Sequence, residues 1–250
     1  MRPEDARPRL RALGFDDDDV EILAEHFLES ERGGRHGHGL SRIAWLETLP
    51  DLDPAAHPVR LESGAAYERW DGCGALGYLT LAAAVRAQLE SPPEHVRLVV
   101  CSRTFPTGAL GSWARQLALG GLVALLTATS PRRLPPPGGG VPLTGTNPLA
   151  VAIPSTDGRP VVADVSMGAV THGDVLAGRA RPEELVPFGG EQGHKAFALA
   201  VGLQLLVDAL VPVEGHGAVL LVARPEADPV PGFRELAAGV RLPGDAFRPA

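Results

Sequence analysis

Residues 96–127 read VRLVVCSRTFPTGALGSWARQLALGGLVALLT, and this stretch decides the fold class. The compact apolar run at 96–101 predicts a buried strand, and the run at 121–127 predicts another. Between them, the spacing of the apolar residues over 108–119 predicts a helix. Because strands and helices interleave, the sequence predicts an α/β or α+β fold.

The alternation of helices and strands continues on both sides of this stretch. Toward the C-terminus the pattern predicts strands at 149–153, 160–164 and 218–223, and a long apolar helix at 195–210. Toward the N-terminus it predicts helices at 4–13, 20–30, 40–46 and 76–90, and an extended segment at 58–71. The tail from residue 225 is expected to be a loop with a helical turn near 233–238. The acidic run 16–19 is expected to cap the second helix, since negative charge is favourable at a helix N-terminus.

Composition excludes several classes of protein. The 250 residues are 44% hydrophobic and carry 30 acidic against 23 basic side chains, a net charge of −7. An acidic chain argues against nucleic acid and against anionic membrane surfaces as partners. Two cysteines do not build a disulfide framework. Polar residues follow Met1 directly and glycines or polar residues interrupt the apolar runs, so we expect neither a signal peptide nor a transmembrane helix, and a cytoplasmic location.

The segment Gly72–Gly77 matches the dinucleotide-binding pattern G-x-G-x-x-G by letter. That pattern needs a buried strand before it and a carboxylate at the end of a second strand about 20 residues later. The preceding residues 67–71 are polar and poor as a central strand, and Glu90 and Glu94 close a helix instead. We therefore interpret Gly72–Gly77 as a turn that enters a helix.

Three histidines, His26, His36 and His38, lie close in sequence, but no carboxylate or cysteine stands beside them at ligand spacing, so no metal site is predicted. His38 and Arg42 are four residues apart at a helix start and share one face. A group that titrates near neutral pH beside a fixed guanidinium suits an anionic substrate with a carbonyl to be protonated. The alternative is a solvated loop histidine and a surface arginine.

Three further positions have a functional and a structural interpretation. Thr146 and Asn147, in the turn Gly145–Pro148, could line a ligand or serve the turn alone. Asp164 closes an apolar strand, where a carboxylate needs a partner or a ligand. Lys195 lies in the first turn of the long apolar helix, against the helix dipole, where it could orient an anion or point into solvent.

In this order, the pieces resemble the type 2 malate/L-lactate dehydrogenase family, which includes ureidoglycolate dehydrogenase and Δ1-piperideine-2-carboxylate reductase. Each motif is weak alone, but six in sequence order are specific. The matching segments are Gly34–Arg42, Asp71–Gly77, Gly145–Leu149, Val161–Ser166, Gly193–Leu199 and Arg241–Gly244.

The resemblance implies a non-Rossmann fold with a mixed sheet in the cofactor domain. It implies a cofactor-binding domain over 76–204, a helical, dimerisation and substrate-side domain made of 1–75 and 205–250, and a homodimer. It implies hydride transfer between NADH or NADPH and a small substrate that carries a carboxylate. The catalytic residues carried over are His38, Arg42 and Lys195; the cofactor-binding residues are Thr146, Asn147, Asp164, Val165 and Ser166.

The sequence also departs from the family pattern. The family usually carries a second histidine in a segment that corresponds here to Cys101–Gly111, which has none. Gly37 stands where the family has serine before the histidine, and Ala196 where it has glycine after the lysine. The chain is shorter than the family by some tens of residues, which we place near 178–187 and 225–232.

Two hypotheses follow. The first is a divergent NAD(P)H-dependent reductase of a cyclic imino acid or a 2-oxo acid, or a dehydrogenase of the matching 2-hydroxy acid. An iminium is already electrophilic, so His38 or water would suffice to deliver a proton. The second is a non-redox enzyme, such as a lyase or cyclase, or a binding subunit on a degenerate dehydrogenase scaffold.

Overall fold

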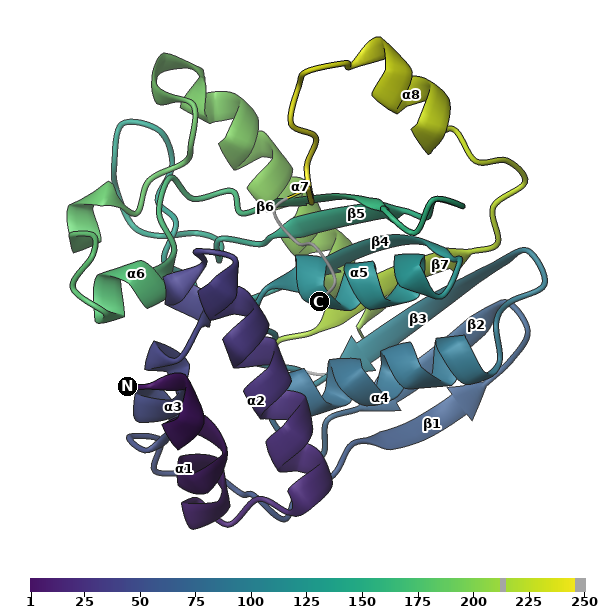
Figure 1. The fold of residues 1–250 in the computed structure, drawn as a ribbon. Coiled ribbons are helices and arrows are strands. Elements are labelled where there is room, and N and C mark those ends of the chain that lie inside the picture. The colour runs from purple at the N-terminus through teal and green to yellow at the C-terminus, as the bar shows by residue number, and fades with distance from the viewer. Residues whose placement is uncertain (212–214, 246–250) are drawn as a thin grey trace.

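A computed structural model describes residues 1–211 and 215–245 (Figure 1). Its centre is a mixed seven-stranded sheet with the order β1-β2-β3-β7-β4-β5-β6. Strands β2 and β3 are parallel, and every other neighbouring pair is antiparallel. The strands are β1 (Val59–Ser63), β2 (Tyr67–Asp71), β3 (Val96–Ser102), β4 (Val123–Ala128), β5 (Leu149–Ile153), β6 (Val161–Val165) and β7 (Ala218–Ala223). The mixed α+β fold predicted from the sequence is confirmed.

Successive side chains of a strand point to opposite faces of the sheet. Both faces carry apolar side chains here, and helices cover both. On β3, Val99 and Cys101 face the main core with α4 (Gly77–Glu90) and α5 (Leu110–Leu119). Val100 faces the opposite side, against the end of α7 (Gly193–Leu210). The remaining helices are α1 (Ala6–Ala12), α2 (Asp17–Arg32), α3 (Ser41–Leu46), α6 (His172–Leu176) and α8 (Val230–Leu236), with short 3-10 turns that include η2 (His36–His38).

Of the N-terminal helices, α2 lies beside α4, and α1 packs on α2 (Figure 1). Helix α2 begins where the sequence predicts a cap, since the Asp16 carboxylate accepts a hydrogen bond of 2.8 Å from the Asp19 N–H. Phe27, on the buried face of α2, is fully enclosed in the main core. This packing fixes the end of α2 and therefore the position of η2, which follows it.

The polar segment 67–71 is a strand of the sheet, contrary to our expectation that it is too polar for such a position. Glu68, Trp70 and Asp71 are all buried in β2. The Glu68 carboxylate accepts a hydrogen bond from the Trp70 indole and pairs with Arg97 at 3.9 Å. Buried polar groups are tolerated where they have such partners. Gly72–Gly77 still enters a helix, α4, as predicted.

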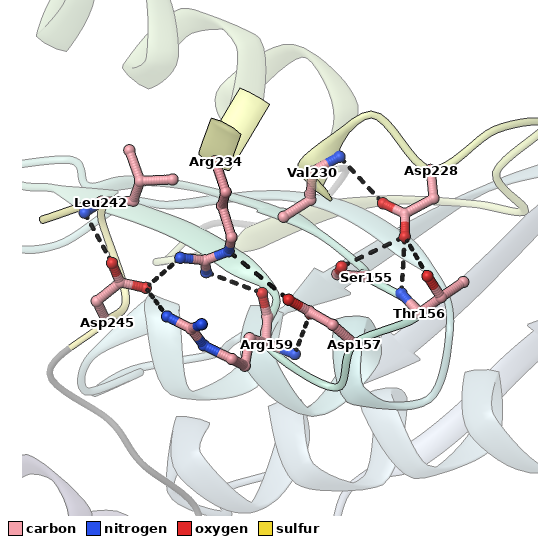
Figure 2. A network of polar contacts seen from close by, with 9 residues as sticks. All are labelled: Ser155, Thr156, Asp157, Arg159, Asp228, Val230, Arg234, Leu242 and Asp245. Atoms are coloured by element: carbon pink, nitrogen blue, oxygen red, sulfur yellow. Dashed lines mark hydrogen bonds and ion pairs between the residues drawn. The ribbon is translucent and has the colours of Figure 1, made fainter. Parts of the chain in front are cut away.

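The C-terminal segment returns to the far edge of the sheet, where a polar network holds it (Figure 2). Asp228 accepts a hydrogen bond of 2.7 Å from the Thr156 N–H, next to β5. Arg234 of α8 donates to the Asp245 carboxylate at 2.8 Å and to the Arg159 carbonyl at 3.0 Å. Strands from both predicted domains lie in the one sheet, and the domain boundaries stay a prediction.

Helix α7 leaves much of its apolar surface exposed. Leu205 is 61% exposed and Leu199 is 50% exposed. By length and composition alone, the stretch Gly190–Leu210 could cross a membrane, which the interrupted apolar runs of the sequence did not lead us to expect. One such helix is weak evidence for a membrane protein, because helices of soluble proteins meet the same criterion.

Candidate functional site

A cleft opens where η2 and α3, the β3–α5 loop, the turn after β4 and α6 come together. It consists of two adjoining pockets, which we call the Arg42 end and the Asp164 end after a residue that lines each. Both pockets are lined by Gly37, His38, Gly108, Thr146 and Pro148. The Arg42 end has a volume of about 100 Å³, where one water needs roughly 10–15 Å³ on the same measure. The Asp164 end has a volume of about 290 Å³. The cleft therefore has room for a small molecule at one end and for a larger group at the other.

His38 and Arg42 both line the Arg42 end, on one side of it. Arg42 is buried, and its guanidinium lies 3.9 Å from the centre of the Trp45 ring. Tyr78 lines the same end of the cleft; burial raises its pKa, and the charge of Arg42 opposes that rise. Burial, followed by the charges of Arg42 and Arg35, lowers the pKa of His38 to about 4. At neutral pH, His38 is therefore an uncharged donor or acceptor beside a fixed cation.

Two further basic residues line this end, and sequence reasoning missed both. They are Arg133, from the turn after β4, and His172, the first residue of α6. Burial, followed by the charges of Arg133 and Arg42, lowers the pKa of His172. Nothing local in the sequence marks either residue, because each reaches the cleft only through the packing of distant segments.

The β3–α5 loop closes the Arg42 end with Phe105, Pro106, Thr107 and Gly108. None of these four lining residues carries a titratable side chain. Gly108 has φ +69°, and a Cβ there would come within 2.2 Å of His26 Nε2. Glycine is therefore required, because the loop passes directly over the buried His26 ring.

At the other end, Asp164 acts as a helix cap. Its Oδ2 accepts a hydrogen bond of 2.8 Å from the Gly111 N–H, in the first turn of α5. The Arg35 guanidinium lies 3.4 Å from the same oxygen. Burial raises the pKa of Asp164, and these two partners oppose the rise. From the sequence we expected this carboxylate to need a partner or a ligand. The protein itself supplies partners, the Gly111 N–H and Arg35.

The other predicted site residues divide into two groups. Thr146 lines both ends of the cleft, and Ser166 lines the Asp164 end. The fully buried Asn147 instead donates hydrogen bonds of 3.0 Å from its side-chain amide to the Ala200 carbonyl and to Gln204 Oε1, which ties the turn to α7. Val165 and Lys195 are exposed and are not among the residues that line the cleft. The catalytic and cofactor roles assigned to all eight residues stay predictions.

The Asp164 end offers the polar groups that a nucleotide cofactor would need. Ser166, Thr171 and Thr146 supply hydroxyl groups, and Arg35 supplies a guanidinium. Hydroxyl groups and guanidinium suit the ribose and phosphate groups of a dinucleotide. A Cβ on Gly37 would come within 2.5 Å of Thr171 Oγ1, so the close approach of η2 to α6 depends on this glycine. The residues present therefore fit NADH or NADPH.

One group outside the cleft could hold a metal ion. Ligand atoms of Asp16, Asp19 and His57 lie within 4.8 Å of one another at the start of α2. Asp16 already caps α2 there, and exposed acidic groups often cluster without an ion. None of these three residues lines the cleft, so the cluster contributes no group to it.

Comparison with known proteins agrees with this architecture. The malate/L-lactate dehydrogenase family model matches residues 6–187. The Δ1-pyrroline-2-carboxylate/Δ1-piperideine-2-carboxylate reductase of Pseudomonas syringae pv. tomato is 32% identical over 220 residues, which are 76% of this chain and 63% of that protein. The 2,3-diketo-L-gulonate reductase of Salmonella typhi is 28% identical over 231 residues, which are 83% of this chain and 69% of that protein.

A solved structure shares the fold. The Δ1-piperideine-2-carboxylate reductase of P. syringae pv. tomato superposes with a TM-score of 0.81 and 26% identity, covering 98% of this chain and 89% of that one. By sequence, the chain spans just under two thirds of its curated pyrroline/piperideine-2-carboxylate reductase relative.

Proposed function

The chain belongs to the malate/L-lactate dehydrogenase family, and we propose that it is an NAD(P)H-dependent oxidoreductase. Its substrate would be a cyclic imino acid or a 2-oxo acid, or the matching 2-hydroxy acid in the reverse direction. The observation that carries this proposal is the pairing of His38 with the buried Arg42 at one end of the cleft, where none of the described lining residues is acidic.

Each residue of the Arg42 end has a definite part in this proposal. Arg42 binds the substrate carboxylate, because a guanidinium makes strong charge-assisted hydrogen bonds to an anion. Stacking on the Trp45 ring holds that guanidinium in place. The uncharged His38 ring donates a hydrogen bond to the carbonyl oxygen of a 2-oxo acid, or accepts one from the protonated nitrogen of a cyclic imino acid. The β3–α5 loop covers the reacting group and excludes water.

The cofactor would bind at the Asp164 end, held by Ser166, Thr171 and Arg35 through its polar groups. When bound, it supplies the hydride that adds to the carbon of a C=O or C=N bond. A proton must reach the oxygen or nitrogen of that bond. For a 2-oxo acid, the His38 N–H would give up this proton while the other ring nitrogen takes one from water. An imino acid can arrive already protonated on nitrogen, which lessens the need for the missing second histidine.

One observation favours a second candidate function. The lining segment Phe105–Gly108 carries no titratable side chain where the family usually places a histidine. A scaffold that has lost hydride transfer would serve as a non-redox lyase or cyclase, or as a binding subunit. Such a protein would keep the anion-binding Arg42 end but would not need a cofactor.

A cofactor titration separates the two candidates. We expect NADH or NADPH to bind the wild-type protein with a dissociation constant below millimolar, measured by quenching of protein fluorescence. Asp164→Asn keeps an acceptor for the Gly111 N–H, so it tests the charge of Asp164 without removing the cap of α5. The cofactor that binds is then used to follow reduction of Δ1-piperideine-2-carboxylate and of 2-oxo acids through loss of dihydronicotinamide absorbance.

Two arginine variants then test the Arg42 end of the cleft, where the substrate would bind. Arg42→Gln should raise KM by about 10- to 100-fold, the effect of losing one hydrogen-bonded charge. Arg132→Gln, at an exposed arginine outside the cleft lining, is the matched control and should leave KM unchanged. If neither cofactor binds at millimolar concentration, the redox proposal is wrong and the second candidate stands.

The apolar surface of α7 supports a homodimer as part of this proposal. Leu199, Leu205 and Leu206 are exposed on one helix, and burying large apolar side chains is the main driving force for association. A cytoplasmic location stays a prediction from the sequence.

A further inference from the structure

The Arg42 end of the cleft holds two guanidinium groups, one more than a single carboxylate requires. Arg42 comes from α3, and Arg133 comes from the turn after β4. Among the described residues that line this end, none carries a negative charge. A partly buried cation without a counter-charge is costly, and a bound anion would relieve that cost.

Arg133 has no carboxylate partner in the part of the chain that the structure describes, and it is partly buried. Burial, followed by the charge of Arg42, lowers the pKa of Arg133. Its charge in turn contributes to the lowered pKa of His172, which lines the same end of the cleft. Asp174, the acid that acts on His38, already pairs with Arg179 at 3.2 Å.

The backbone presents Arg133 at a fixed place. Its N–H and that of Leu134 both donate to the Thr144 carbonyl at 2.9 Å. The Leu134 side chain is fully buried against Met167 and Ala200. An anchored backbone reduces the entropy that is lost when the side chain binds a ligand.

A second donor comes from the same turn. Ser130 lines the cleft beside Arg133, three residues earlier in the chain. Arg42, in contrast, stacks on Trp45 of its own helix, α3. This end of the cleft therefore offers anion-binding groups from two elements, α3 and the turn after β4.

We propose that Arg133 and Ser130 form a second anion subsite, so that the substrate is a doubly acidic 2-oxo or cyclic imino acid. One carboxylate would bind Arg42, next to the reacting carbon, and a second acidic group would bind Arg133. This inference rests on the proposed function, because it names the class of substrate for the same cleft. Arg133 lines the Arg42 end and not the Asp164 end, which favours the substrate over a cofactor phosphate as its ligand.

Two matched pairs of acids test this subsite by calorimetry, without any turnover. The first pair is 2-oxoglutarate and 2-oxovalerate, which share a five-carbon chain and differ by one carboxylate. The second pair is pyridine-2,6-dicarboxylate and pyridine-2-carboxylate, stable planar analogues of a cyclic imino acid. In at least one pair, we expect the wild-type protein to bind the diacid about tenfold or more tightly than the monoacid, as one charged hydrogen bond would give.

Variants of Arg133 and Arg132 show which residue causes the preference for the diacid. Arg133→Gln should reduce the preference to about twofold or less. Arg132→Gln removes the same charge one residue away, on an exposed side chain, and should keep the wild-type preference. NADH and NADPH titrations on the same variants should show no change for Arg133→Gln.

Four outcomes would overturn the subsite. If Arg133→Gln weakens both acids of a pair equally, the two arginines bind a single carboxylate. If it weakens only the nucleotide, Arg133 serves the cofactor. A preference that survives in Arg133→Gln, or the absence of binding by all four acids at about 10 mM, also contradicts the proposal. If the diacid preference depends on Arg133 but no hydride transfer is found, the subsite stands and the proposed function fails.

Discussion

His26 should make the protein lose stability as the pH falls below neutral. The ring is buried and stacks on Trp113 at a centroid distance of 4.6 Å. Burial, followed by the charges of His38 and Arg35, lowers its pKa from 6.5 to about 3. Its Nε2 accepts a hydrogen bond of 3.2 Å from the Ala109 N–H, which the neutral ring alone can accept.

The sign follows from proton linkage. Below about pH 6.5, the unfolded chain binds a proton at this histidine, while the folded protein stays unprotonated until about pH 3. The free energy of unfolding therefore falls as the pH decreases through that window. From about pH 7 to about pH 5, the loss from this one group is about 2 kcal/mol.

Urea unfolding followed by far-UV circular dichroism at both pH values measures the effect. His26→Gln does not titrate and keeps an acceptor oxygen for the Ala109 N–H. We expect it to be less stable than the wild type at pH 7, but to lose about 2 kcal/mol less on acidification to pH 5. His95→Gln, at an exposed histidine, is the matched control and should behave like the wild type.

An equal pH dependence in His26→Gln and the wild type would refute this reasoning. If the variant does not fold, proton NMR of the wild-type ring gives the answer instead. The His26 resonances should not move between about pH 7 and about pH 5, and a midpoint near 6.5 would show that burial does not hold the ring neutral.

Three further results are expected. Gly108→Ala places a methyl group against the His26 ring at a positive φ, so it should lower the free energy of unfolding by about 2 kcal/mol or more; thermal unfolding at or above the wild-type temperature would contradict this. A carboxylate bound at Arg42 cancels a charge that lowers the pKa of His38, so binding near pH 5 should be accompanied by proton uptake; calorimetry in buffers of different ionisation enthalpy measures it, and a heat independent of the buffer would exclude it. Leu205→Glu places a charge on the exposed face of α7 and should shift a homodimer toward the monomer in light scattering coupled to gel filtration; an unchanged mass would argue against α7 as the interface.

Much of the candidate site could be predicted from short-range patterns. The prediction that His38 and Arg42 share one helix face is wrong, because α3 begins at Ser41 and His38 belongs to η2. Both residues nevertheless line the cleft. Thr146 was found through its turn. Asn147 shows the limit of this reasoning, because its turn is local but its buried hydrogen bonds to α7 are not. Arg133 and His172 carry no local signal at all.

The sequence alone predicted most of the helices and strands, because hydrophobic periodicity and capping are properties of neighbouring residues. It did not predict α6 or the division of 58–71 into β1 and β2. It also determined the family, through six short segments in order. Only the tertiary structure decided that β7 lies between β3 and β4, that polar β2 is buried, and that Asp164 caps α5. Only it brought Arg133 to the same cleft as Arg42. Strand order, burial and the partner of a charge all depend on contacts between residues far apart in the chain, which local patterns do not encode.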